Sequence, residues 1–105
     1  MPRRELEFWT GPLAGRSHFA SHVEPDEIAR VERARVRQTD GREEILDGVT
    51  AIAVGGHSPG QQVTVVGDVV LASDAIHFYE EYELQRPFAV MASLEDMYRA
   101  YDLVG

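Results

Sequence analysis

The chain has 105 residues, of which 18 are acidic and 10 are basic, so its formal net charge is −8. Such a surface repels phosphate backbones and anionic lipid, which argues against a general nucleic-acid binder and against a protein that docks on membranes. The chain has no Cys and no apolar run near the ~18 residues of a transmembrane helix. We therefore expect one cytoplasmic domain over residues 1–105, without Cys ligands or Cys nucleophiles.

The first part of the chain predicts short helical segments separated by turns. Residues 6–9 are apolar and are followed by Gly11-Pro12, a turn signal, and we expect Trp9 to anchor this segment in or beside the core. Residues 25–37 predict a helix, because a Pro suits the first helical position and two acidic residues follow it in the first turn.

The middle of the chain, residues 42–72, predicts strands. Residues 61–66 and 69–72 are apolar and β-branched, and they flank Gly67-Asp68, a two-residue hairpin loop of the Gly-X kind. The residues expected in the core of this sheet are Val63, Val65, Val69, Val70 and Leu71.

The last part of the chain predicts two helices. Residues 76–84 form the first, and Ser93 begins the second as its N-cap, with Asp96 at the third helical position. The acidic pairs 43–44 and 80–81 predict solvated surfaces. This order of elements is typical of an α+β or α/β protein whose sheet is covered by helices.

The sequence GGHSPG at residues 55–60 holds His57 in a stiff turn between two predicted strands. Its glycines allow a sharp turn and a close backbone approach, and Pro59 stiffens the turn. A loop of this kind presents an imidazole that is fixed and partly open, as a metal ligand must be. The alternative is a tight turn in which His57 hydrogen-bonds a backbone group, and the loop taken alone favours that alternative.

The sequence LASDAIH at residues 71–77 carries Asp74 just beyond a predicted strand. A carboxylate in this position suits a metal ion or general acid–base chemistry, but it is equally typical of the N-cap of the following helix. His57 and Asp74 flank the predicted hairpin. Because antiparallel pairing returns the chain to its starting edge, we expect the two side chains at the same end of the sheet.

The His57 loop, the hairpin and the Asp74 loop together resemble the second half of a metallo-β-lactamase-fold hydrolase, most closely the branch of N-acyl-homoserine lactonase-like enzymes. The resemblance extends over residues 5–104. It implies an α+β fold that is half of a four-layer αββα sandwich, with a mixed sheet and helices on one face. It further implies that His57 binds zinc and that Asp74 bridges two zinc ions, which activate a hydroxide for attack on a carbonyl.

His77 follows Asp74 by three residues, where lactonase-like members often carry a Tyr that contacts the substrate or the developing oxyanion. The resemblance therefore implies a catalytic contact of that kind for His77, which could also shuttle a proton or simply face its helix. Phe78, Tyr79 and Tyr82 could line a pocket near the site or pack within the helix.

The sequence lacks the main ligand motif of the family, H-x-H-x-D-H, and also its final His ligand. Only His57 and Asp74 match ligand positions, whereas a catalytic zinc usually has three protein ligands and a water. We therefore expect this chain to be part of a hydrolase for a lactone, ester or related small acyl substrate, and to be inactive alone. The missing half would come from the same polypeptide or from a partner chain.

Two other functions stay open. A non-catalytic half-sandwich would leave a sheet face and a strand edge uncovered, and would form a homodimer through them. A nucleotide- or anion-binding loop at residues 55–60 is weakly indicated, because the Gly spacing fits no phosphate-binding motif and the chain has no Lys. His18 and His22, spaced i,i+4, could bind a metal from one helix face or be two surface imidazoles.

Overall fold

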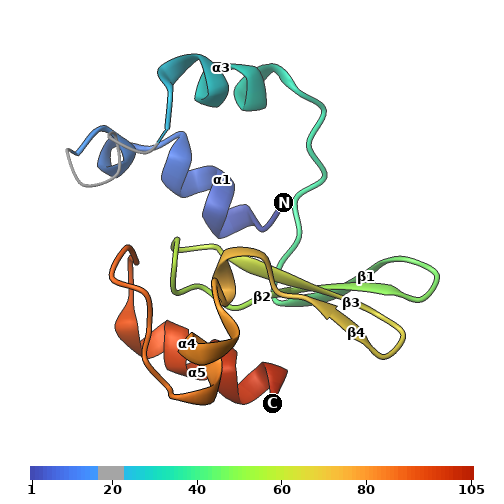
Figure 1. The fold of residues 1–105 in the computed structure, drawn as a ribbon. Coiled ribbons are helices and arrows are strands. Elements are labelled where there is room, and N and C mark those ends of the chain that lie inside the picture. Colours follow the sequence, from blue (N-terminus) through green and yellow to red (C-terminus); the bar gives the residue numbers. More distant parts are fainter. Residues whose placement is uncertain (17–22) are drawn as a thin grey trace.

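A computed structural model describes residues 1–16 and 23–105, so the His18 and His22 pair lies outside the described residues. An antiparallel sheet occupies the middle of the chain, with helical segments before and after it (Figure 1). The elements in chain order are α1 (Arg3–Trp9), the 3₁₀ turn η1 (Pro12–Gly15), α3 (Pro25–Arg33), β1 (Arg42–Leu46), β2 (Val49–Ala53), β3 (Gln62–Val66), β4 (Val69–Leu71), the 3₁₀ turn η2 (Ser73–Ala75), α4 (Tyr79–Glu83) and α5 (Leu94–Val104).

The sheet is a meander with the strand order β1-β2-β3-β4. Val66 pairs with Val69, so Gly67 and Asp68 form the predicted two-residue loop, with Gly67 at a φ of 58°. The α+β class is confirmed, but the described strands are antiparallel throughout rather than mixed. The longest connection between them, residues 54–61, is too short for the crossover that parallel strands require.

The two faces of the sheet have different neighbours. Ile52 and Val63 form the core together with Ala75 of η2 and Ala100 of α5. On the other face, Leu71 lines a shallow hollow shared with the first residues of the chain. The helices are therefore not confined to one face, and α1 lies across the sheet from α4 and α5 (Figure 1). The described residues form one four-stranded sheet, whereas a four-layer sandwich contains two.

The predicted core is correct for β3 and wrong for β4. Val63 is buried and Val65 packs against the core. Val69, Val70 and Leu71 are 57%, 37% and 56% exposed. β4 is an edge strand of this sheet, and within the described residues it is covered by neighbouring elements only in part. The apolar pattern of β4 indicates that its side chains are suited to burial, but it does not indicate whether other segments of this chain pack over them.

The helix after Pro25 ends earlier than residue 37, because Ala34 is already extended, with a ψ of 155°. Beyond it the chain runs to Thr39, which pairs with the N-terminus: the Thr39 N–H donates to the carbonyl of Met1 at 2.9 Å, and the Arg3 N–H donates to the carbonyl of Thr39 at 2.8 Å. This tertiary pairing draws the segment out of the helix.

Of the predicted helix over residues 76–84, only α4 (Tyr79–Glu83) forms, because Ile76 and Phe78 are both extended, with φ near −140°. The predicted N-cap of α5 is confirmed, since the Oγ of Ser93 accepts a hydrogen bond from the Asp96 N–H at 3.2 Å. None of the described helices combines the length and the apolar character needed to cross a membrane.

Gly60 packs directly on α1, and a Cβ there would lie 2.3 Å from the backbone nitrogen of Glu5. We expect Gly60→Ala to lower the free energy of unfolding by about 1–3 kcal/mol, as overpacking typically does. Gly15→Ala is the matched control, because a Cβ at Gly15 would meet nothing within 4 Å. Equal midpoints of urea unfolding for the two variants would contradict the close packing of Gly60 on α1.

Candidate metal centre

His57 lies in the loop between β2 and β3, at one end of the sheet. Gly55 and Gly56 have φ values of 73° and 102°, which glycine adopts without strain, and a Cβ on Gly56 would lie 2.7 Å from the sulfur of Met97. The Nδ1 of His57 is 2.8 Å from the carbonyl oxygen of Val90. A carbonyl oxygen only accepts, so in the neutral ring Nδ1 carries the proton and Nε2 presents its lone pair.

Helix α1 holds the same loop from another side. One carboxylate oxygen of Glu5 accepts hydrogen bonds from the Ser58 hydroxyl and from the Gly60 N–H, each at 2.8 Å. The other oxygen accepts a hydrogen bond from the indole of Trp9 at 2.7 Å. Trp9 thus helps to anchor the first segment, and Glu5 fixes the His57 loop against it.

Asp74 lies in η2, immediately after β4, at the same end of the sheet as His57. The predicted proximity is confirmed, because Oδ2 of Asp74 is 3.9 Å from Nε2 of His57. The side chain of Asp74 is 59% exposed. No helix begins at residue 76, so the alternative in which Asp74 caps such a helix is wrong. Ser73 has a φ of 49°, a left-handed conformation that turns the chain out of β4.

His77 joins His57 and Asp74 in one cluster. Its Nε2 is 3.9 Å from Oδ1 of Asp74, so each oxygen of this carboxylate faces one imidazole. The two imidazole rings lie edge to face, with centroids 5.0 Å apart. One ligand atom from each of the three side chains lies within 4.8 Å of the others, so the three groups could hold a metal ion.

His77 is held by Glu81, which is only 5% exposed, so the prediction that residues 80–81 form a solvated surface is wrong for this residue. One oxygen of Glu81 accepts from the backbone N–H of His77 at 2.8 Å and lies 3.1 Å from its Nδ1. The other accepts from the backbone N–H of Phe88 at 3.3 Å and from the hydroxyl of Tyr101. The carboxylate thus receives donors from three segments of the chain.

These hydrogen bonds set the ionisation of the pair. Burial would raise the pKa of Glu81, but the bonds from Tyr101, His77 and Phe88 together outweigh burial and lower that pKa below its ordinary value. Burial, reinforced by the Glu81 carboxylate, raises the pKa of Tyr101. Glu81 is therefore an acceptor at neutral pH, so Nδ1 of His77 donates to it and Nε2 presents a lone pair toward Asp74.

Sequence reasoning missed Val90, Glu81 and Tyr101, which orient the two imidazoles. The i,i+4 spacing of His77 and Glu81 is a signal that could have indicated their contact. Val90 and Tyr101 give no such signal, because they reach the site from a loop and a helix that lie far along the chain.

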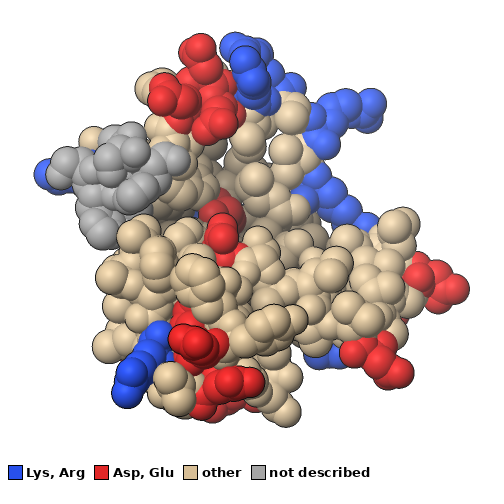
Figure 2. All heavy atoms as spheres, viewed as in Figure 1, with Lys and Arg blue, Asp and Glu red and all other residues tan. Residues whose placement is uncertain are grey.

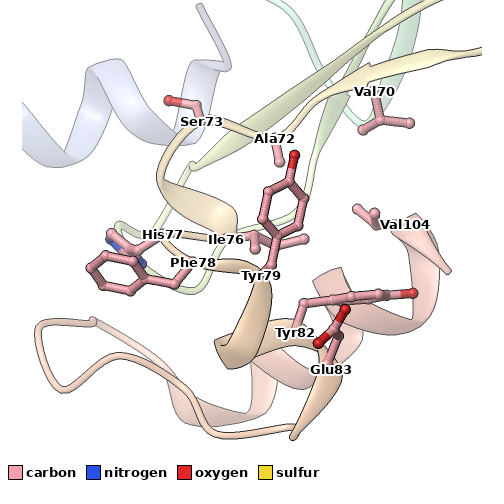
Figure 3. Close-up of a pocket in the computed structure, with 10 residues that line it drawn as sticks. All are labelled: Val70, Ala72, Ser73, Ile76, His77, Phe78, Tyr79, Tyr82, Glu83 and Val104. Atoms are coloured by element: carbon pink, nitrogen blue, oxygen red, sulfur yellow. The ribbon is translucent and has the colours of Figure 1, made fainter.

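An open cavity of about 710 Å³ lies beside His77. The aromatic residues Phe78, Tyr79 and Tyr82 line it, as one of the two sequence-based alternatives predicts. Figure 3 shows Tyr82 and Tyr79 on the side of the cavity nearer Val104, and His77 with Phe78 on the other side. Its wall is mainly apolar, which suits a hydrocarbon group better than a charged one.

Charged side chains are unevenly distributed around this structure. In the view of Figure 2, basic side chains gather around α3 and the segment that follows it, and uncharged side chains cover most of the middle of the face. Acidic side chains lie mainly toward the outer parts of the same view. Basic and acidic side chains also lie at the lower left of this view, in the region of α4 and α5 in Figure 1.

The structure thus brings His57 and Asp74 together at one end of an antiparallel sheet, as the sequence predicts. No family model and no curated protein matches the chain. One similar solved structure is an N-acyl homoserine lactone hydrolase with the product N-hexanoyl-L-homoserine bound at its catalytic metal centre. Its TM-score is 0.77 at 23% identity, and the match covers 98% of this chain and 39% of the hydrolase.

A second similar structure comes from work on how indirect contributions of mutations underlie the optimization of a new enzyme function. Its TM-score is 0.78 at 22% identity, with 98% of this chain and 38% of that chain covered. At such identities the likeness concerns the fold alone, and it confirms the predicted resemblance to part of an N-acyl homoserine lactone hydrolase. The chain spans about two fifths of the length of the solved structures that it matches.

Removing the hydroxyl of Tyr101 tests the buried network around Glu81. We expect Tyr101→Phe to lower the free energy of unfolding by about 1.5–3 kcal/mol, because a buried carboxylate loses one charge-assisted hydrogen bond. Tyr98→Phe is the matched control, since Tyr98 lies on the exposed side of the same helix. Thermal and urea unfolding measure the stability of both variants. An equal loss of stability in the two would contradict a network that depends on Tyr101.

Proposed function

We propose that this chain contributes His57 and Asp74 to the metal centre of a hydrolase that acts on a lactone, an ester or a related acyl compound. The proposal is carried by one observation: the Nε2 lone pair of His57 faces the Asp74 carboxylate at 3.9 Å. The fold around this pair is shared with an N-acyl homoserine lactone hydrolase that has a catalytic metal centre. Neutral imidazole and carboxylate suit zinc, and we propose two zinc ions in the complete enzyme.

The residues of the chain are arranged for binding and orientation. His57 offers Nε2 as a neutral ligand without a change of tautomer, because Val90 already accepts the Nδ1 proton. Asp74 would serve as the bridging carboxylate, and each of its two oxygens faces one imidazole. When bound, a divalent cation supplies a water of lowered pKa and polarises the acyl carbonyl. The apolar cavity next to His77 would receive the hydrocarbon part of the substrate.

The chain alone is proposed to be inactive toward acyl substrates. His57 and Asp74 are fewer ligands than a catalytic zinc requires, and the chain spans about two fifths of the hydrolase that it resembles. The further ligands, in the form H-x-H-x-D-H, would come from another segment of the same polypeptide or from a partner chain.

The DNA upstream of the Met1 codon tests this proposal first. We expect an open frame that encodes H-x-H-x-D-H, and a longer protein that hydrolyses acyl lactones or aryl esters only when metal is present. In that protein Asp74→Asn should lower kcat/KM by about 10³-fold or more, because a metal contributes several kcal/mol to the transition state. Asp68→Asn, in the exposed hairpin loop, is the matched control. Full activity of Asp74→Asn would contradict the proposal, whereas a frame without the motif would leave a partner chain as the source of the further ligands.

A second candidate function, a self-associating module without catalysis, is favoured by an apolar surface of the sheet. The strand register aligns Leu46, Val49, Val66 and Val69 in one row across the sheet, and Leu71 extends the same face. Most of these side chains are exposed. Contiguous exposed apolar surface marks an interaction site, and a second copy of the chain would bury it.

Sedimentation of the chain tests this second candidate. We expect a dimer, and we expect Val69→Arg to shift it to a monomer at the same concentration, because the interface would bury an unpaired charge. Leu103→Arg is the matched control, since Leu103 is exposed on α5 and away from this row. A monomeric wild-type chain would contradict the second candidate.

A further inference from the structure

We infer that His77 is a third metal ligand, so that this chain binds one divalent cation of the zinc type through His57, Asp74 and His77. The inference rests on the proposed metal site and deepens it. It gives His77 a different role from the contact with substrate or oxyanion that the resemblance implies, because the geometry around its ring directs Nε2 to the same carboxylate that faces His57.

The first argument concerns the protons of the two rings. Nδ1 of His57 donates to a backbone carbonyl, and Nδ1 of His77 donates to the Glu81 carboxylate. Each neutral ring therefore presents a lone pair at Nε2, and both lone pairs face the oxygens of Asp74. The two Nε2 atoms and the Asp74 carboxylate are then all hydrogen-bond acceptors. Each Nε2 lies 3.9 Å from one carboxylate oxygen, which is longer than a hydrogen bond. A cation bound between the three side chains would interact favourably with every one of these acceptors.

The second argument concerns distance. Zinc lies about 2.0–2.2 Å from nitrogen and oxygen ligands, so two ligand atoms on a tetrahedral ion are about 3.4 Å apart. Both Nε2–oxygen distances are 3.9 Å, so a modest closure of the cluster brings the ligand atoms to that spacing. Asp74 has an exposed side chain, which can close toward the imidazoles by a small rotation.

The third argument concerns Glu81, which has the position of an outer partner to a metal-bound histidine. A ligating histidine commonly donates its second ring N–H to a carboxylate, which fixes its tautomer and its orientation. Burial of a carboxylate is unfavourable unless it is fully hydrogen-bonded, and Glu81 is supplied with donors by His77, Phe88 and Tyr101. If Glu81 only held α4 against α5, its substitution would leave the affinity for a bound ion unchanged.

The test uses the 105-residue chain with His18→Gln and His22→Gln, so that imidazole signals and imidazole ligation come from His57 and His77. Nitrogen-15 NMR of the rings is recorded at neutral pH, before and after addition of Zn²⁺. We expect both rings as Nδ1–H tautomers, and we expect both Nε2 resonances to shift on addition of Zn²⁺. This measurement needs no substitution within the site, so it does not depend on whether a variant folds.

Zinc affinity is then measured by competition with a chromophoric chelator. We expect His77→Phe to lower it by about 100-fold or more, and Glu81→Gln by about 10–100-fold. The amide of Glu81→Gln can donate to Nδ1 of His77, which moves the ring proton to Nε2 and removes the lone pair. Glu80→Gln, exposed on the same helix, is the matched control and should retain the affinity of the parent chain.

The outcomes separate this inference from the proposed function. A zinc-dependent shift of His57 without one of His77, or unchanged affinity of His77→Phe, would overturn the inference and leave the hydrolase proposal standing. Absence of zinc binding by the parent chain would also overturn the inference, and it would leave the hydrolase proposal standing, because that proposal takes further ligands from another segment or chain. Binding through all three groups, combined with a longer protein that hydrolyses no acyl substrate, would support the inference and refute the proposed function.

Discussion

The hydrogen-bonded carboxylate of Glu81 is the constraint on which the C-terminal part of the structure depends. An ionised carboxylate has about four acceptor positions, and in the protein interior each unfilled position is unfavourable. Glu81 fills its positions with donors from the segment before α4, the loop after it and helix α5. Ring contacts between His77 and Phe88 and between Tyr82 and Tyr101 join the same segments, and the carboxylate adds directional hydrogen bonds to this packing. The carboxylate therefore fixes both their packing and the ring of His77.

Glu5 plays the corresponding role on the N-terminal side. It joins α1 to the His57 loop through Ser58 and Gly60, and it also holds the indole of Trp9. Two carboxylates thus position the two imidazoles, one from each end of the chain. Asp74, by contrast, lies exposed between the rings. This arrangement suits a site in which the two imidazoles are held rigidly and the Asp74 carboxylate can move to fit a bound ion.

The parts of this arrangement that follow from local chemistry could be predicted from the sequence. The loop at Gly67, the cap at Ser93 and the meeting of His57 with Asp74 all depend on short-range pairing rules. The errors have a common origin in contacts between distant segments. Thr39 pairs with the N-terminus and ends α3 early, and Tyr101 converts Glu81 from a surface residue into a buried one. No pattern within a helix or a strand encodes such partners.

One additional segment could both cover the exposed apolar row of the sheet and complete the proposed set of metal ligands. Leu71 belongs to this apolar face, and Asp74 follows it by three residues, so a layer packed on the face would end beside the cluster of His57, Asp74 and His77. A second copy of the chain would cover the face but would bring only the same ligands again. A different segment with its own histidines would supply both the missing layer and the missing ligands. The hydrolase proposal accounts for both features with that one segment, whereas self-association accounts only for the apolar face.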